Sequence, residues 1–382
     1  MGYNNLFFSF KKKPLIGFIA TAVLVSSYYT YRQYLFHQRY PNSLYAVLDY
    51  YGFDSPAQKA ALRYLMQQAG INNPDFLLEH QVADQTELSK LILTLVRETQ
   101  SKFTIRTGNQ ERWEVETSTW MKDEEQQQQI LAALNTLKMT APIPPRFQER
   151  EVISILGGSK KIMELRLAYA DELFIDNKLP SKWLVLLAGE RYVTLNIDGD
   201  KQELSNLANK LGKDIAKLTE TDLMIAAYEA SKLYGKFPEH FLLIDTPKGN
   251  LPRPTTETTV ADFCAWLRQQ PEIRKITFVS NQPHVEYQKA IIAQVFSKQA
   301  IKVDFEVIGP GYDVKIVNNN AKQINYLVQA LGSRIWAATP EVINTIGLDL
   351  SSPKLRAEYL ELYKKQPLIY QNLDNTIPKP KL

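Results

Sequence analysis

Polar residues that could carry chemistry stand directly after four apolar runs in the second half of the chain. These residues are Gly157-Gly158-Ser159 after the first run, Gly189-Glu190 after the second, Asp245 after the third and Ser280-Asn281 after the fourth. Paired glycines let the backbone approach a bound group, and free amides at the start of a helix favour an anion. We therefore expect Gly157, Gly158 and Ser159 to receive a small anionic or nucleotide-like ligand.

His284 and Glu190 are the candidate catalytic residues, because an imidazole and a carboxylate can both move protons. His284 opens an expected helix, where it can orient an anionic group, shuttle a proton or only cap the helix. Glu190 can form a carboxylate pair with Asp245, or it can cap a helix or pair with Arg191. Ser280 near His284 would suit a hydrolase, but the chain has no Gly-x-Ser-x-Gly turn that exposes a nucleophilic serine.

The other candidate ligand-binding residues lie at expected strand ends or helix starts. They are Gly189, Thr255, Glu257, Ser280 and Asn281. The third apolar run is followed by a loop over residues 247–254 that holds Lys248 and Arg253. The glycine turn matches neither the GxGxxG fingerprint nor the phosphate loop, so the sequence identifies no cofactor.

Metal and disulfide chemistry are not indicated. The histidines are His37, His80, His240 and His284, and no pair of them has the spacing of metal ligands. Cys264 is the single cysteine, which excludes an intramolecular disulfide and cysteine-based zinc motifs. Because it shares helical spacing with Val260 and Leu267, we expect Cys264 to be a buried packing thiol.

The elements that must position these residues follow an alternating pattern after residue 150. Apolar runs expected to be strands are Val152–Leu156, Trp183–Leu187, Phe241–Ile244, Ile276–Val279 and Val303–Val307. Helical patterns between them are Lys160–Phe174, Thr221–Leu233, Thr258–Gln269 and Val285–Phe296. The alternation predicts an α/β domain over 150–310 with a Rossmann-like parallel sheet flanked by helices. An insertion interrupts it, with Val193–Ile197 and then a helix over Gln202–Leu218 expected at the ligand edge.

The start of the chain has the pattern of a membrane anchor. Lys11-Lys12-Lys13 precede an uncharged stretch, Pro14–Tyr31, and tyrosines follow it. About 20 apolar residues cross the hydrocarbon of a bilayer, so residues 14–36 are expected to be a single transmembrane signal anchor. The lysines place residues 1–13 in the cytoplasm and the rest of the chain outside. The alternatives are a cleaved signal peptide and a core helix.

Residues 40–147 predict a membrane-proximal, mostly helical α+β module. Helices are expected from Ser55 to Gly70, from Asp84 to Glu98 and onward from Gln126, and two short strands, Phe103–Arg106 and Trp113–Glu116, are expected around a turn. Pro142, Pro144 and Pro145 mark the boundary with the α/β domain. This module is where we expect a protein partner.

The chain closes with a helical extension over 311–371 and a polar tail over 372–382 that we expect to be disordered. The expected helices are Gln323–Ile335, Pro340–Ile346 and Pro353–Lys365. We expect them to pack against the sheet edge or the membrane-proximal module. The formal net charge is only +4 over 382 residues, which does not indicate a nucleic-acid partner.

The order of motifs over about residues 150–310 resembles the SanA, ElyC and YdcF-like proteins, a family whose domain is of unknown function. The matching segments are Ile153–Gly158, Arg166–Phe174, Leu186–Glu190, Thr219–Met224, Thr255–Glu257, Val279-Ser280 and His284. The chain departs from the family at Thr258, where the family has asparagine, and at Tyr287, where it has arginine. Loss of that arginine removes a planar donor group suited to phosphate or carboxylate, so the ligand differs or the site is inactive.

The resemblance implies a protein of the bacterial inner membrane whose C-terminal domain faces the periplasm. It also implies a role in envelope polysaccharide or peptidoglycan homeostasis. The leading hypothesis is therefore a membrane-anchored envelope protein that binds a small anionic ligand. The alternatives are a non-enzymatic scaffold with a degenerate site, and a hydrolase or transferase that uses His284.

Overall fold

The computed structural model describes residues 41–104, 121, 123–313, 320–348, 350 and 352–364. The expected anchor over 14–36, most of the expected hairpin and the expected tail over 372–382 lie outside these residues. Within them, no helix combines the length and the apolar character that crossing a membrane requires.

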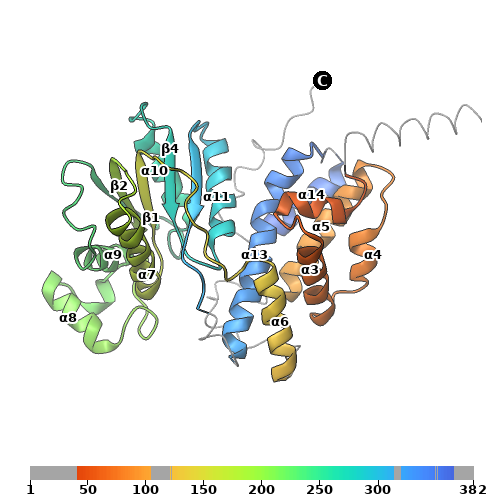
Figure 1. The fold of residues 1–382 in the computed structure, drawn as a ribbon, viewed down its shortest axis with the longest axis horizontal. Coiled ribbons are helices and arrows are strands. Elements are labelled where there is room, and N and C mark those ends of the chain that lie inside the picture. The colour runs from red at the N-terminus through yellow and green to blue at the C-terminus, as the bar shows by residue number, and fades with distance from the viewer. Residues whose placement is uncertain are drawn as a thin grey trace, which may run out of the picture.

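A parallel sheet of five strands forms the centre of one half of the molecule (Figure 1). The strands are β1 (Val152–Leu156), β2 (Trp183–Gly189), β3 (Phe241–Thr246), β4 (Lys275–Val279) and β5 (Asp304–Ile308). Their order is β3-β2-β1-β4-β5, and every neighbouring pair is parallel. The predicted Rossmann-like α/β fold is thereby confirmed, and the order reverses direction between β1 and β4.

Helices cover both faces of this sheet because the strand side chains alternate between two apolar cores. Ile153 and Ile155 of β1 pack in one core with α7 (Lys160–Ala170) and α9 (Glu220–Glu229). Val152 and Leu156 of the same strand belong to the other core, with α10 (Thr256–Leu267) and α11 (Val285–Lys298). Cys264 of α10 is fully buried, as predicted, and burial raises the pKa of its thiol to about 12.

The insertion after β2 differs in detail from the prediction. Within the expected piece Val193–Ile197, residues 195–197 form a turn. The expected helix is divided into α8 (Lys201–Leu211) and a short 3-10 turn, η4 (Ile215–Lys217). Gly212 separates them, because its left-handed backbone (φ 62°) ends α8. α7 also ends earlier than expected and continues as a π-helical turn, η3 (Asp171–Asp176).

The other half of the molecule is helical and joins the two ends of the described chain. It contains α2 (Leu44–Val47), η1 (Leu48–Tyr51), α3 (Pro56–Gln68), α4 (Pro74–Glu79), α5 (Gln85–Lys102), α6 (Glu124–Thr136), α13 (Ala321–Thr345) and α14 (Pro353–Lys364). α5 is longer than expected, so Phe103 is its C-cap rather than the start of a strand.

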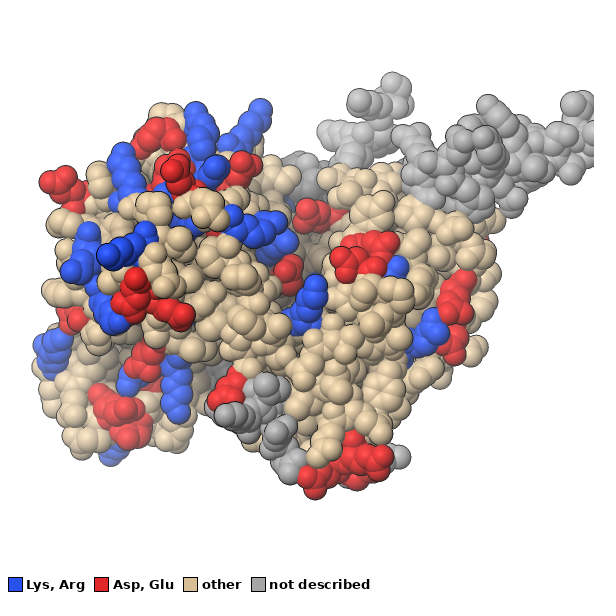
Figure 2. Space-filling view, in the orientation of Figure 1, with Lys and Arg blue, Asp and Glu red and all other residues tan. Residues whose placement is uncertain are grey.

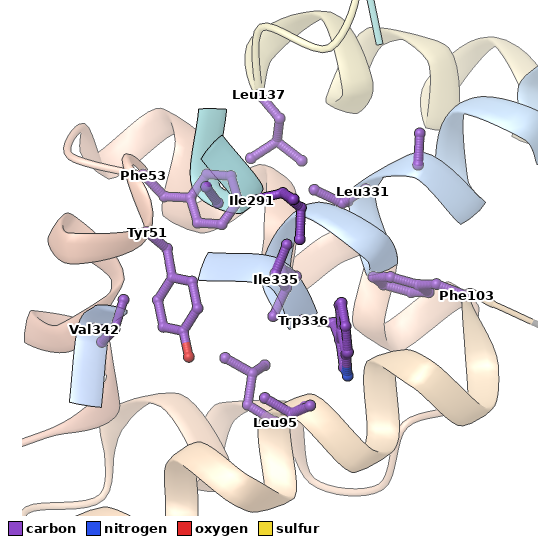
Figure 3. Close-up of a cluster of buried hydrophobic side chains, with 14 of the residues drawn as sticks. Tyr51, Phe53, Leu95, Phe103, Leu137, Ile291, Leu331, Ile335, Trp336 and Val342 are labelled. Atoms are coloured by element: carbon purple, nitrogen blue, oxygen red, sulfur yellow. The ribbon is translucent and has the colours of Figure 1, made fainter. Parts of the chain in front are cut away.

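α13 lies between the α/β half and the other helices and contacts both, through α11 on one side and α5 on the other (Figure 1). Figure 3 shows Ile335 and Trp336 of α13 in one cluster with Leu95 of α5, and Ile291 of α11 reaches the same cluster. The apolar core is therefore continuous across the two halves, and α13 is held in place from both sides.

α13 is one helix where the sequence predicts two, because it continues through Pro340. A proline inside a helix leaves the carbonyl four residues earlier without its amide donor. That carbonyl belongs to Trp336, and it accepts a hydrogen bond from the Tyr363 hydroxyl of α14 at 3.1 Å. The packing of α14 thus replaces the missing donor.

On the face shown in Figure 2, Lys and Arg side chains are interspersed with Asp and Glu over the α/β half, and the helical half carries fewer charges. The described residues on this face form no extended patch of one sign. On this face, charge selection of a ligand therefore depends on local clusters of charged side chains rather than on one extended patch.

Candidate functional site

A cavity of about 330 Å³ opens at the carboxyl edge of the sheet, beside the point where the strand order reverses. Ligands of open α/β sheets bind at this position, because loops from both sides of the reversal diverge there. The predicted residues that line the cavity are Gly157, Gly158, Ser159, Gly189, Thr255 and His284. The structure therefore brings together residues that are up to 127 positions apart in the sequence.

Arg166 of α7 lies buried in the floor of the cavity and connects the loops that follow β1 and β4. Its Nη1 donates to the carbonyl oxygens of Leu156, at 2.8 Å, and of Gly157. Its Nε and Nη2 donate to Oδ1 of Asn281 at 3.0 and 2.8 Å. Burial lowers the pKa of this guanidinium to about 10, so it still carries a positive charge at neutral pH.

Arg191, just after β2, holds the other side of the glycine turn. Its Nη1 and Nη2 donate to the two carboxylate oxygens of Asp198 at 2.8 and 2.9 Å, and Nη2 also donates to the Gly158 carbonyl at 3.0 Å. Asp198 belongs to the insertion and is fully buried. It also accepts hydrogen bonds from the amides of Thr194 and Lys160. The insertion therefore supplies the counter-charge that orients Arg191.

Glu220 is the acidic residue among the described residues that line the cavity, and it lies against the glycine turn. Arg191 Nε donates to its Oε2 at 2.8 Å. An ideal Cβ built on Gly157 would lie 2.0 Å from Oε1, so residue 157 is glycine to leave room for this carboxylate. Burial raises the pKa of Glu220, although the positive charges of Arg191, Arg253 and Arg166 oppose that effect.

The carbonyl groups of the glycine turn point at arginines, which fixes where its amides point. A trans peptide directs its N–H opposite to its C=O. Because Arg166 holds the Gly157 carbonyl and Arg191 holds the Gly158 carbonyl, the Gly158 amide points away from Arg166 and the Ser159 amide points away from Arg191. The Ser159 side chain makes no capping hydrogen bond to the first turn of α7, and the Lys160 amide donates to Asp198. The amides that favour an anion at this helix start are therefore those of Gly158 and Ser159.

The loop between β3 and α10 forms the outer wall. Arg253, Pro254 and Thr255 line the cavity, and the Arg253 side chain is exposed. Thr255 is the N-cap of α10 and accepts a hydrogen bond from the Thr258 amide at 3.4 Å. Gly189 has a packing role here, since a Cβ on it would lie 2.7 Å from both Pro254 Cγ and the Thr246 carbonyl oxygen.

His284 is the N-cap residue of α11 and lines the cavity together with Tyr287 and Tyr326. Its Nε2 lies 2.6 Å from the Tyr326 hydroxyl, and the two rings meet edge to face, with centroids 5.6 Å apart. His284 does not cap α11 with its side chain. Its imidazole is therefore directed at α13, which carries Tyr326.

Four of the predicted site residues do not line the cavity. Glu190 points to the loop after β3, where it accepts from the Lys248 amide at 3.2 Å. Glu257 faces Lys298 at 3.5 Å on the side of α11. Ser280 is buried and donates to the Gln288 side chain, and Asn281 is buried against Arg166.

The pairing of Glu190 with Asp245 is absent for a local reason. Asp245 accepts a hydrogen bond from the Thr221 hydroxyl at 2.6 Å, and Glu190 turns toward Lys248 instead. Sequence reasoning missed Glu220, Arg166 and Tyr326 as site residues. Glu220 follows the capping residue Thr219, and a search for acids at helix starts would have found it.

Three guanidinium groups, of Arg166, Arg191 and Arg253, face two carboxylates, of Glu220 and Asp198, so the site carries an excess positive charge of one. This favours an anionic ligand over a cationic one. No group of three or more potential metal ligands occurs in the described residues. Comparison with protein-family models, curated proteins and solved structures finds no match to this chain.

Proposed function

We propose that this chain binds a small anionic ligand, such as a phosphate ester, in the cavity at the reversal of strand order. The observation that carries the proposal is the combination of three arginines with the glycine turn before α7 around one cavity. Guanidinium groups and helix amides are the two protein features that most often hold phosphate and carboxylate groups.

The three arginines have different parts in this proposal. Arg166 and Arg191 are buried and hold the glycine turn, so they set the field and the backbone geometry. Arg253 is exposed at the outer wall of the cavity and holds no part of the glycine turn in the hydrogen bonds described above. It is therefore the arginine whose removal should weaken binding without unfolding the domain.

We further propose that the chain acts in the cell envelope, anchored in the bacterial inner membrane through residues 14–36, with the α/β domain in the periplasm. The lysines before the apolar stretch and the resemblance to the SanA, ElyC and YdcF-like proteins support this proposal. A ligand from polysaccharide or peptidoglycan metabolism would fit both the place and the charge of the site.

The test is titration of the purified full chain, in detergent, with orthophosphate and glycerol 3-phosphate by isothermal calorimetry. Arg253→Gln should weaken binding at least about fivefold, because it removes one charged hydrogen-bond donor. Arg97→Gln is the matched control, since Arg97 is an exposed arginine of α5 in the helical half. If neither anion binds saturably to the unaltered chain, the proposal fails and the scaffold alternative gains support.

A hydrolase or transferase activity is the second candidate, because His284 and Glu220 line the same cavity and both can exchange protons. Ser280 is not the nucleophile of this candidate, since it lies buried against Gln288. The candidate predicts release of orthophosphate from a phosphate ester, lost in His284→Gln. Binding without product release would leave the chain a binding protein.

A further inference from the structure

The cavity has two chemically different sides, and the strand order separates them. Arg191 and Arg253 follow β2 and β3, which lie on one side of β1. His284 and Tyr287 follow β4, which lies on the other side of β1. The cavity therefore spans the reversal point, with charged groups on one side and rings on the other.

The ring side is completed by a residue from the helical half. Tyr326 lies on α13 and reaches the cavity beside His284, at 2.6 Å from Nε2 to the hydroxyl oxygen. Tyr312 lies behind it, with the two tyrosine rings inclined by 27° and their centroids 6.3 Å apart. Two different neighbours thus fix the position of the Tyr326 ring.

The packing of α13 in the core holds the helix that carries this ring. The helix runs through the apolar core of the helical half, where Trp336 and Ile335 are buried, and it also packs on α11 (Figure 3). A fixed aromatic surface needs little ordering when a ligand binds, which favours stacking over an induced contact. Between the charged side and the ring side, the floor of the cavity is formed by Arg166, which is hydrogen-bonded to Asn281.

We infer that the ligand carries a ring next to its anionic group, and that the ring packs against Tyr326 and Tyr287 while the anion lies among the arginines and the glycine turn. Both a nucleobase and the apolar face of a sugar can pack on aromatic side chains in this way. A cavity of about 330 Å³ has room for one ring and one anionic group rather than for a dinucleotide. This inference rests on the proposed function and names the ligand class of the same site.

The test compares four probes on the purified full chain by isothermal calorimetry: orthophosphate, glycerol 3-phosphate, glucose 1-phosphate and uridine 5′-monophosphate. We expect at least one of the two ring-bearing phosphates to bind about tenfold or more tightly than glycerol 3-phosphate. If glucose 1-phosphate shows the larger increase in affinity, the ligand is a sugar phosphate, and if uridine 5′-monophosphate does, the ligand is a nucleotide.

Substitutions then locate the ring. Tyr326→Ala should lower the ratio of the affinity for the ring-bearing phosphate to the affinity for glycerol 3-phosphate from about tenfold to about twofold or less. Tyr326→Phe should keep the preference, because it retains the ring and loses only the hydroxyl that meets His284. Tyr287→Ala is the second variant in case Tyr326→Ala does not fold, and Tyr234→Ala is the control, since Tyr234 is exposed and outside the cavity.

Each outcome tests either the ring inference or the anion site. If glycerol 3-phosphate binds but a ring adds no affinity, or if the preference survives both alanine substitutions, the ring inference is wrong and the anion site stands. If no probe binds, orthophosphate included, the anion site itself is wrong and the inference falls with it.

Discussion

Arg191 donates from Nε to Oε2 of Glu220 over 2.8 Å, inside a cavity that two other arginines also line. The Glu220 carboxylate therefore lies beside these guanidinium groups, as the negative group of a bound anion would. An incoming anion must share the arginines with this carboxylate. Binding and the protonation of Glu220 are thus linked through the same charges.

The first prediction is that anion affinity increases as the pH falls through the pKa of Glu220. Burial has already raised this pKa above its ordinary value, and a bound anion adds a second negative charge that raises it further. Binding therefore takes up a proton. Sulfate is the suitable probe, because it does not itself titrate in the range from pH 5 to pH 8, and calorimetry in two buffers of different ionisation enthalpy measures the proton uptake.

Glu220→Gln should remove this proton uptake and bind sulfate more tightly than the unaltered chain at a pH above the pKa of Glu220, because the competing charge is gone. His284 also lines the cavity and can exchange protons, so His284→Gln serves as the control and should retain the uptake that belongs to Glu220. An unchanged pH dependence in Glu220→Gln would assign the proton to another group. The pKa of Glu220 is higher in the folded chain than in the unfolded chain, so protonation of Glu220 stabilises the fold. This stabilisation is present at low pH and is lost as the pH rises through the folded-state pKa.

The second prediction concerns the glycine turn. Gly157→Ala should lower the free energy of unfolding by about 1–3 kcal/mol, because a Cβ there meets Glu220 Oε1 at 2.0 Å and the Leu187 carbonyl at 2.8 Å. Gly158→Ala is the matched control. Its Cβ first meets Ile162 Cγ2 at 3.0 Å, which is a much milder overlap than the 2.0 Å approach at Gly157, so it should cost less. Urea unfolding measures both, and equal losses would contradict the proposed role of Gly157.

Much of the fold could be read from the residues because local pattern and burial agree there. The expected strand Val152–Leu156 matches β1 at both ends, since all its side chains are buried and glycines follow it. The edge of the sheet where the site lies could be read as well. The end of a strand determines at which edge of the sheet a residue lies, but it does not determine the direction in which the side chain of that residue points.

That direction depends on contacts between distant segments, and here the sequence prediction was incomplete. Glu190 turns to the Lys248 amide, and Ser280 turns into the core toward Gln288. Arg191 meets Glu220 only because the insertion between them folds back, and Tyr326 comes from a helix of the other half of the molecule. No local pattern records which distant groups meet, so the pairing of Arg191 with Glu220 and the presence of Tyr326 in the site could not be identified from spacing, although Glu220 by itself stands out as an acid at a helix start.

The third prediction tests the hydrogen bond that lets α13 continue through Pro340 and so helps to position Tyr326. Tyr363→Phe removes the donor to the buried Trp336 carbonyl and should lower the free energy of unfolding by about 1–3 kcal/mol. In the Pro340→Ala background the same substitution should cost less, because the amide of residue 340 can then donate to Trp336 as in an ordinary helix. A double-mutant cycle in urea measures this coupling. Equal costs of Tyr363→Phe in both backgrounds would show that the tyrosine hydroxyl does not replace the amide that proline lacks.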